Sequence, residues 1–517
     1  MKSIHKASPR SFITWGCCMV LLFGVAGCSN QPRNLVVPGE TPSQSSPPSA
    51  NSTRDVANEA VSFATQIATY SSATFDKLPG WLEDNQVESW PALLSSCTKL
   101  SSRSPQWAGL CQRAQSVDRT NNLAVRKFYE QEFSLYQLRD DAKKIDGVIT
   151  AYFEPDIQGS RQYKAPYIYP VYGVPDDMVF LDARKIDRKI ALAVVVARVE
   201  GRNVSVQVGL NTREINSPGI YSLDLTKLTL DTLDRKVRLR VDGKRLVPYF
   251  TRSEIEKQGA PNAKVLAFVD NLWELYEMQI QGTGRIKLTD GSTLHLSYAE
   301  QNGHPFIPPG PPAGSKVAAA KTRGGFALLD TNEDSDDEDP TAVRTRGFKL
   351  TKPPSGTTVA VSGRKTTQPA TGSGISDPSY VFFKENPPTG TGPLGALNVP
   401  LLPGRSIAVD PRSTPLGYPV FLSTRDPSTG KPMQRLTVAQ DTGGAIRGAV
   451  RADYFVGNGA LAAKQARRMK ENGQLWLLLP KGLQVATGGS LTKTRGAGSR
   501  DLPQCLLPTE DICVEDE

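Results

Sequence analysis

Residues 438–459 read Val-Ala-Gln-Asp-Thr-Gly-Gly-Ala-Ile-Arg-Gly-Ala-Val-Arg-Ala-Asp-Tyr-Phe-Val-Gly-Asn-Gly. The stretch opens as an apolar run that predicts a strand, and Asp441 stands where this strand ends. Gly443 and Gly444 follow, and glycine both allows backbone angles closed to other residues and lets a ligand approach the main chain. Asp453 then precedes two aromatic residues. We expect two carboxylates near one glycine loop, one of them flanked by aromatic surface.

A third acid lies upstream of this stretch. Asp410 ends the apolar run 406–409 and is followed by Pro-Arg-Ser-Thr-Pro-Leu-Gly. Carboxylates at strand ends beside glycine loops and rings suit chemistry on a sugar, because a ring that displaces water raises the pKa of an acid that must protonate a leaving oxygen. Aspartates in such loops also cap turns and helix starts, so spacing alone leaves a structural role open.

Composition narrows the class of partner. The 517 residues are enough for more than one domain, and the formal net charge is +9. This balance is compatible with an anionic wall polymer or lipid, whereas no cluster of basic residues points to nucleic acid. The chain has three histidines, one of them in the leader. This scarcity argues against a histidine triad or a multi-histidine metal site, and we predict no metal and no cofactor.

The first 28 residues predict an export signal. Basic residues precede the apolar run 12–25, which is too short for an ordinary membrane-spanning helix. The run ends at Val-Ala-Gly-Cys, which resembles a bacterial lipoprotein box and predicts lipidation of Cys28; a plain signal peptide is the alternative. Because Ser29 follows rather than an aspartate, we expect an outer-membrane lipoprotein that faces the periplasm. Residues 29–55 are rich in Pro, Ser and Thr and predict a flexible tether.

Four cysteines lie beyond the leader and fit an exported protein. Cys97 with Cys111, and Cys505 with Cys513, are close pairs that could each form a local disulfide in an oxidising periplasm. A zinc site is the competing interpretation, and the distance between the pairs argues against it.

Periodicity divides the chain by secondary structure. Residues 56–145 read as mainly helical, with Phe63, Ile67 and Tyr70 on one face. We assign the three tryptophans of this region to the core, although an exposed tryptophan can also stack on a sugar. From Gly147 the period becomes two, and short strands recur to about residue 300, with the run 273–282 included in this β-rich block. Residues 461–472 predict a helix, followed by a strand over 475–479.

Several blocks, in order, resemble the lytic murein transglycosylase A (MltA) family, and the last of them resembles its three-aspartate domain. They are Ala-Tyr-Phe-Glu-Pro at 151–155, Gln-Ile-Gln-Gly-Thr-Gly at 279–284, Gln-Asn-Gly-His-Pro at 301–305, Pro-Ser-Tyr-Val-Phe-Phe at 378–383, Pro-Gly-Arg-Ser-Ile-Ala-Val-Asp at 403–410, Pro-Leu-Gly at 415–417, Ala-Gln-Asp-Thr-Gly-Gly-Ala-Ile at 439–446, and Asp453. The blocks span roughly residues 120–480.

This resemblance implies a mainly β fold with helices. It implies a double-psi β-barrel catalytic domain with a helical N-terminal part, built from the discontinuous segments 56–164, 291–307 and 376–482. A second, smaller β-barrel domain is inserted over 165–290, and a groove for the glycan lies between the two. Residues 308–374 depart from the family, because their Pro-rich, acidic and Thr/Gly-rich composition predicts a low-complexity insertion without a packed element. Residues 483–517 are assigned to a tail.

The resemblance also implies a reaction. Such an enzyme cleaves the β-1,4 bond between N-acetylmuramic acid and N-acetylglucosamine in peptidoglycan without water and leaves a 1,6-anhydromuramyl end. One carboxyl group can act as acid and then as base, because the attacking C6 hydroxyl belongs to the substrate. Carried over residue by residue, the resemblance makes Asp453 the acid/base, sets Asp441 beside it and gives Asp410 a supporting role. It also implies glycan contacts, which we assign to Gln281, Gly282, Gln440, Gly443 and Gly444, and further to Tyr152 and Glu154 in the groove.

Two other functions stay open. One is a peptidoglycan hydrolase on the same fold, which would use an activated water and leave a reducing end. The other is a wall-binding lipoprotein without activity, against which the presence of all three aspartates argues. The predicted partners are peptidoglycan glycan strands and outer-membrane lipid, with no nucleic acid, and other cell-wall enzymes are left open.

Overall fold

The computed structural model describes residues 62–186, 193–207, 217–228, 235–307, 342–345, 348–351, 374–486 and 502–507. All of them belong to one compact unit, Glu59–Glu517. The predicted lipidation site Cys28, the tether 29–55, the acidic run 333–339 and Cys513 lie outside the described residues.

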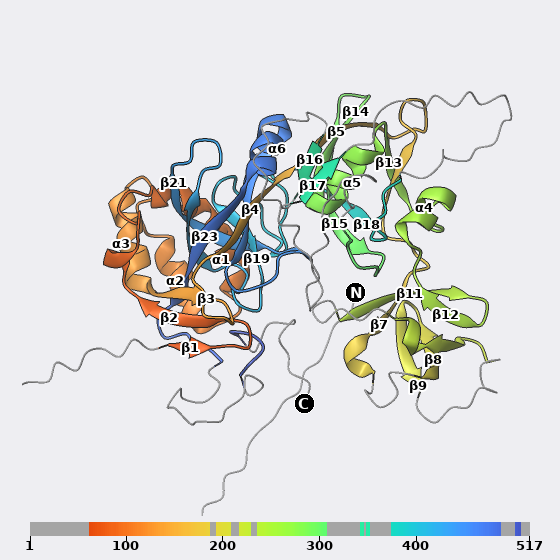
Figure 1. Cartoon of the computed structure of the whole chain (residues 1–517), viewed down its shortest axis with the longest axis horizontal. Helices are drawn as coiled ribbons and strands as arrows, with labels where there is room; N and C mark the ends of the chain where they lie inside the picture. Colours follow the sequence, from red (N-terminus) through yellow and green to blue (C-terminus); the bar gives the residue numbers. More distant parts are fainter. Residues whose placement is uncertain are drawn as a thin grey trace, which may run out of the picture. The chain divides into compact units, whose positions relative to one another are not determined.

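The first sheet contains a closed ring of strands. Its order is β1-β2-β3-β23-β20-β21-β19-β22-β4, and β4 also pairs with β23, which closes six of the nine strands into a barrel. The six are β4 (Gly147–Glu154), β19 (Ser406–Val409), β20 (Pro419–Arg425), β21 (Pro432–Asp441), β22 (Arg451–Asn458) and β23 (Lys470–Pro480). Figure 1 shows β4, from early in the chain, beside strands from its last quarter. The predicted mainly β fold is confirmed, whereas the double-psi connection stays a prediction.

Three helices and three strands build the N-terminal part. The helices are α1 (Trp90–Leu100), α2 (Pro105–Ala114) and α3 (Asn122–Glu132), and the strands are β1 (Phe63–Ala64), β2 (Thr69–Ala73) and β3 (Phe133–Arg139). The prediction of helix was therefore wrong for residues 63–73, because β2 pairs with β3 and its alternate residue Tyr70 enters the core. Trp81, Trp90 and Trp107 are each 1% exposed, which confirms their assignment to the core.

A second closed barrel follows along the chain. Its strands are β7 (Val179–Asp182), β8 (Val194–Glu200), β9 (Asn203–Gln207), β10 (Ile220–Asp224), β11 (Lys236–Asp242) and β12 (Arg245–Pro248). Alternate residues such as Leu181, Leu223 and Leu239 fill a core of its own. This barrel lies within the predicted insertion 165–290, whose domain boundaries stay a prediction.

The third sheet has the order β18-β15-β14-β5-β13-β6. Its strands are β5 (Asp156–Ser160), β6 (Tyr169–Tyr172), β13 (Val265–Val269), β14 (Thr283–Leu288), β15 (Thr293–Gln301) and β18 (Val381–Asn386). Helices α4 (Arg252–Gln258) and α5 (Leu272–Gln281) flank β13 in sequence. The run 273–282 is therefore helical and not β: Asn271 caps its first turn, and Gly282, with a φ of 79°, ends it.

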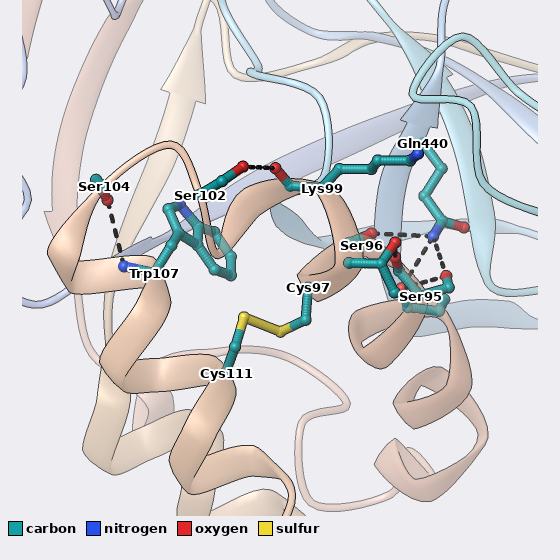
Figure 2. The surroundings of a disulfide bond; sticks show 11 residues. Ser95, Ser96, Cys97, Lys99, Ser102, Ser104, Trp107, Cys111 and Gln440 are labelled. Atoms are coloured by element: carbon teal, nitrogen blue, oxygen red, sulfur yellow. Dashed lines mark hydrogen bonds between the residues drawn. A yellow bond between two sulfur atoms is a disulfide. The ribbon is translucent and has the colours of Figure 1, made fainter. Parts of the chain in front are cut away.

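The remaining elements complete the chain. Helix α6 (Gly459–Arg468) precedes β23, as predicted in outline. Most of the predicted insertion 308–374 lies outside the described residues, but two of its segments, β16 (Ala342–Thr345) and β17 (Phe348–Thr351), pair as a hairpin. The predicted disulfide between Cys97 and Cys111 is present and joins α1 to α2 (Figure 2). Cys505 is also disulfide-bonded, which argues against the zinc interpretation for that pair.

Candidate active site

A cavity of about 740 Å³ lies against the end of β21. One wall comes from the glycine loop after β21 and from the loop 394–398, and the other comes from the C-terminal end of α5 with β14 and β15. Four of the predicted glycan contacts, Gln281, Gly282, Gly443 and Gly444, line this cavity. Segments far apart in sequence therefore meet at one concave surface, as ligand sites commonly require.

Asp441 is the member of the aspartate trio that lines the cavity. It is the last residue of β21, where the strand gives way to the glycine loop. Its two carboxylate oxygens accept hydrogen bonds from separate elements: the Tyr152 hydroxyl on β4 donates to Oδ2 at 2.9 Å, and the Ala396 backbone N–H donates to Oδ1 at 2.9 Å. The carboxylate is partly exposed and held in one orientation.

Asp453 occupies a different environment. It is the third residue of β22 and is fully buried, and its Oδ1 accepts a hydrogen bond of 2.6 Å from the Thr150 hydroxyl on β4. Ala408 on β19 pairs with Asp441 on one side and with Asp453 on the other. The two aspartates are therefore two strand spacings apart, roughly 10 Å between backbones, and Asp453 is not among the described residues that line the cavity.

Asp410 lies in a polar cluster beneath the loop. Its carboxylate is fully buried and forms a two-pronged ion pair with Arg412, at 3.0 and 2.7 Å. It also accepts a hydrogen bond of 2.9 Å from the Gly448 N–H, which ties down the segment after the glycine loop. These contacts fit the supporting role expected of Asp410.

The other predicted glycan contacts lie off the cavity wall. Among the described lining residues, Gln440, Tyr152 and Glu154 do not appear. The Gln440 side chain is fully buried and its amide is bonded to α1 and β19, so the structure gives it no amide group to offer a glycan. Tyr152 is buried too and reaches the site through its bond to Asp441. Glu154 is buried, 3.8 Å from Arg285.

The cavity includes residues that sequence reasoning missed. Gln279 and Thr283 belong to the block 279–284, so that motif carried a signal for them. Tyr298 lies on β15 and is 43% exposed, which makes its ring available for stacking on a sugar. Ala396 contributes only its backbone N–H, for which residue type gives no signal.

In the ranges that the structure describes, no group of three or more His, Cys, Asp or Glu side chains is arranged to hold a metal ion. None of the helices in those ranges is long and apolar enough to cross a membrane.

Both the sequence and the fold of this chain are similar to those of known proteins. The model of the MltA specific insert domain matches residues 148–217 and 212–311, and the model of the 3D domain matches residues 405–479, which contain all three aspartates. The crystal structure of MltA from Neisseria gonorrhoeae is similar with a TM-score of 0.61 and 26% identity, over 82% of this chain and 94% of that one. The chain belongs to the MltA family.

Curated members of the MltA family are also similar in sequence. The membrane-bound lytic murein transglycosylase A of Escherichia coli (strain K12) is 30% identical over 236 residues, which are 44% of this chain and 55% of that protein. The protein of the same name from Vibrio cholerae is 27% identical over 237 residues, again 44% and 55%. The chain thus spans about half the length of the curated MltA relatives that it matches.

Proposed function

We propose that this chain is a peptidoglycan lytic transglycosylase that cleaves the β-1,4 bond between N-acetylmuramic acid and N-acetylglucosamine without water. The observation that carries this proposal is the Asp441 carboxylate, oriented by Tyr152 and Ala396 on the wall of a large cavity. The curated relatives are named lytic murein transglycosylases, and the segment that matches the 3D domain model contains Asp410, Asp441 and Asp453.

We infer that Asp453 is the acid/base, the role that the family resemblance gives it, with Asp441 beside it. Both aspartates pair with Ala408 of β19, so their side chains lie on the same face of the sheet. Asp441 lines the cavity, and Asp453 is buried two strands away from it. Burial does not exclude a catalytic acid, because catalytic hydrogen bonds often tighten only when substrate binds.

The reaction follows from one carboxyl group in two protonation states. Asp453 in its acid form gives its proton to the glycosidic oxygen, the bond from that oxygen to C1 breaks, and positive charge develops at C1 of the muramyl residue. The C6 hydroxyl oxygen of the same sugar then bonds to C1, and its proton passes to the Asp453 carboxylate. The enzyme ends in its starting form, and the product carries a 1,6-anhydro ring. Because the nucleophile is part of the substrate, no second carboxylate is needed to activate water.

The cavity wall supports a saccharide as the ligand. The main chain at Gly282, Gly443 and Gly444 offers hydrogen-bonding groups to hydroxyl and acetamido substituents. The Gln281 side chain is buried and its Oε1 accepts a hydrogen bond of 3.2 Å from the Phe153 N–H, so it shapes this wall. Tyr298 adds an exposed ring on β15. A few polar groups together with aromatic surface are the usual composition of a small-molecule site. They match the polar substituents and the apolar ring face of a sugar.

The test compares Asp441→Asn with Asp453→Asn on purified peptidoglycan. Loss of the transferable proton should lower turnover by about 10³–10⁴ in Asp453→Asn, while its folding and glycan binding survive. Asp441→Asn should lower turnover less, because Asp441 tunes the site and does not transfer the proton. Mass analysis of the wild-type products should find anhydro ends; reducing ends would indicate a hydrolase, and no cleavage would indicate a wall-binding protein. Near-normal turnover in Asp453→Asn with a dead Asp441→Asn would make Asp441 the acid/base.

We further propose an outer-membrane lipoprotein that faces the periplasm, anchored through Cys28. Support comes from the lipoprotein box in the leader and from relatives named as membrane-bound. The mass of the mature N-terminal peptide tests this: a diacylglyceryl cysteine at position 28 is expected, and an N-terminus at another residue would contradict the proposal.

A further inference from the structure

Three polar residues form a row across the wall that the third sheet gives to the cavity. Thr283 on β14 pairs with Ser297 on β15, and Ser297 pairs in turn with Lys384 on β18. Residues paired across neighbouring strands face the same side of a sheet. All three line the cavity, so the row runs along its wall.

The other side of these strands is hydrophobic core. Leu296 and Phe383 precede Ser297 and Lys384 in sequence, are each 1% exposed and belong to the core of this sheet. Because successive side chains of a strand point to opposite faces, burial of these two residues directs the row toward the cavity. The Lys384 side chain is exposed there, on a strand that the core holds in place.

The other charged groups of the cavity wall are already engaged. Asp377 accepts hydrogen bonds from two hydroxyl groups, and Asp441 accepts one from a hydroxyl and one from a backbone N–H. Arg252 is 2% exposed, and Arg447 donates to two carbonyl oxygens of its own loop. The Lys384 side chain, by contrast, forms no ion pair or hydrogen bond with any residue that the structure describes. Lys384 therefore presents an unpaired positive charge to the cavity.

The other end of the row also lacks a partner. Thr283 is 7% exposed, and in the described part of the chain its hydroxyl has no hydrogen-bond partner. A buried hydroxyl that stays unbonded costs free energy. Between the two ends, the Ser297 hydroxyl accepts a hydrogen bond of 2.6 Å from the Asn386 amide. An unpaired cation beside unmet hydrogen-bonding capacity indicates a wall that binds an anionic group rich in acceptor oxygens.

We propose that this row is a subsite for a carboxylate carried by the muramyl residue, which Lys384 binds as an ion pair. The inference rests on the proposed function, because it takes peptidoglycan as the substrate. Each muramyl residue carries a lactyl ether, whose carboxyl group is either free or joined to a stem peptide with carboxylates of its own. A lysine ammonium is a point charge on a flexible stem, so it can follow such a substituent.

This subsite distinguishes the two sugars of the glycan strand. N-acetylglucosamine carries no carboxylate, so the ion pair forms only when a muramyl residue lies at this wall. Lys384 thereby favours one of the two registers in which an alternating strand can bind in the cavity, and it is a specificity-determining residue for which bond is cleaved.

The test measures Kd by calorimetry for three ligands. They are muramyl oligosaccharides without peptide, the same oligosaccharides with stem peptides, and chitohexaose, which has no carboxylate. Whichever of Asp453→Asn and Asp441→Asn is inactive serves as the background, so that the ligands stay intact. Adding Lys384→Gln should raise Kd about fivefold for a carboxylate ligand, the upper range for a solvent-accessible ion pair, and leave Kd for chitohexaose unchanged. Weaker binding of the peptide-free ligand identifies the lactyl carboxylate, and weaker binding of the peptide-bearing ligand alone identifies the stem peptide.

Two matched variants separate charge from other effects. Lys384→Arg keeps the charge and should bind all three ligands like its background. Lys257→Gln removes an exposed lysine of α4 that is not among the described lining residues, and it should change no Kd. An equal rise in Kd for chitohexaose, an unchanged Kd for both carboxylate ligands, or weak binding by Lys384→Arg would overturn the inference. If the wild type binds these ligands and cleaves none, the proposed function fails, and the same Kd values still decide the inference.

Discussion

At the scale of single residues, Glu154 shows how burial changes an acid near the site. It is the last residue of β4 and is 2% exposed. Burial raises the pKa of Glu154 to about 7, because the carboxylate loses its water; Arg285 at 3.8 Å opposes this shift and the charge of Asp156 adds to it. The ordinary value is 4.5, so Glu154 changes charge near neutral pH in the folded protein.

This shift predicts a pH-dependent stability. A carboxyl group whose pKa is raised on folding stabilises the folded state below its unfolded pKa, and that contribution is lost as the pH rises through the folded pKa. From about pH 4 to about pH 8 wild type should therefore lose about 3 kcal/mol of unfolding free energy relative to Glu154→Gln, which cannot ionise. Urea denaturation at both pH values measures the difference. The control is Glu83→Gln at an exposed position, and a Glu154→Gln difference no larger than this control's would contradict the prediction.

The sequence identified the aspartate cluster, and the roles that the family resemblance assigns within it stay a proposal. Asp453 is the third residue of β22 and is buried, whereas Asp441 ends β21 directly before the glycine loop, at the rim of the barrel. Which of the two lines the cavity could not be predicted, because it depends on the pairing of both strands with β19.

At the scale of elements, α1 and α2 form a small unit joined by the Cys97–Cys111 disulfide. The helices pack with buried residues of both, including Leu93 and Leu110 in the main core. The bridge closes a loop with a sequence separation of 14 residues. A cross-link of this length removes unfolded conformations that would otherwise compete with the folded state.

Removing that bridge should destabilise the fold. The double variant Cys97→Ser/Cys111→Ser is expected to lose about 3 kcal/mol of unfolding free energy, as estimated from the entropy of a loop of this length. Thermal and urea denaturation measure the loss. Mutation is preferable to a reducing agent, because Cys505 is also disulfide-bonded. Unchanged stability would show that packing alone holds α1 against α2.

The sequence predicted some of the helices and strands better than others. Helices α1 to α3 lie within residues 56–145, which the sequence predicted as mainly helical, and the close spacing of Cys97 and Cys111 allowed the disulfide that joins α1 to α2. Strands β1 and β2 were predicted as helix because their few apolar residues, at spacings of three and four, fit a helical period and do not rule out a strand. Only the pairing of β2 with β1 and β3 decides between the two. Helix α5 was missed although Asn271, followed three residues later by Glu274, is a helix-start signal and Gly282 a stop signal.

At the scale of the whole molecule, a buried ion pair joins the second barrel to the third sheet. Arg238 on β11 donates to Glu300 on β15, with Nη2 at 2.6 Å and Nε at 3.0 Å from Oε1. The two side chains are 4% and 7% exposed, and Lys236 adds a contact of 3.0 Å to Oε2. The partners are 62 residues apart in sequence, so no local pattern predicted them.

We expect the Arg238–Glu300 pair to affect the unfolding free energy chiefly when one partner is removed. Replacing Glu300 by leucine leaves the Arg238 guanidinium buried without its carboxylate and should cost about 3–5 kcal/mol of unfolding free energy. The double variant Arg238→Met/Glu300→Leu removes both charges and should recover most of that loss, because burying a charge pair itself costs desolvation energy. Denaturant unfolding of the two single variants and the double variant measures the coupling.

The exposed pair between Arg113 and Glu132 is the matched control for this cycle. Arg113 is 57% exposed, so Glu132→Gln should cost less than about 1 kcal/mol. If Glu300→Leu costs no more than this control, the Lys236 carbonyl oxygen and solvent must be compensating Arg238, and the pair would not secure the barrel to the sheet. If instead the double variant is as unstable as Glu300→Leu, the loss arises from packing around β11 and β15 and not from an unpaired charge. If stability recovers only in the double variant, the buried charge is the cause, because the summed losses of unfolding free energy in the two single variants would then exceed the loss in the double variant.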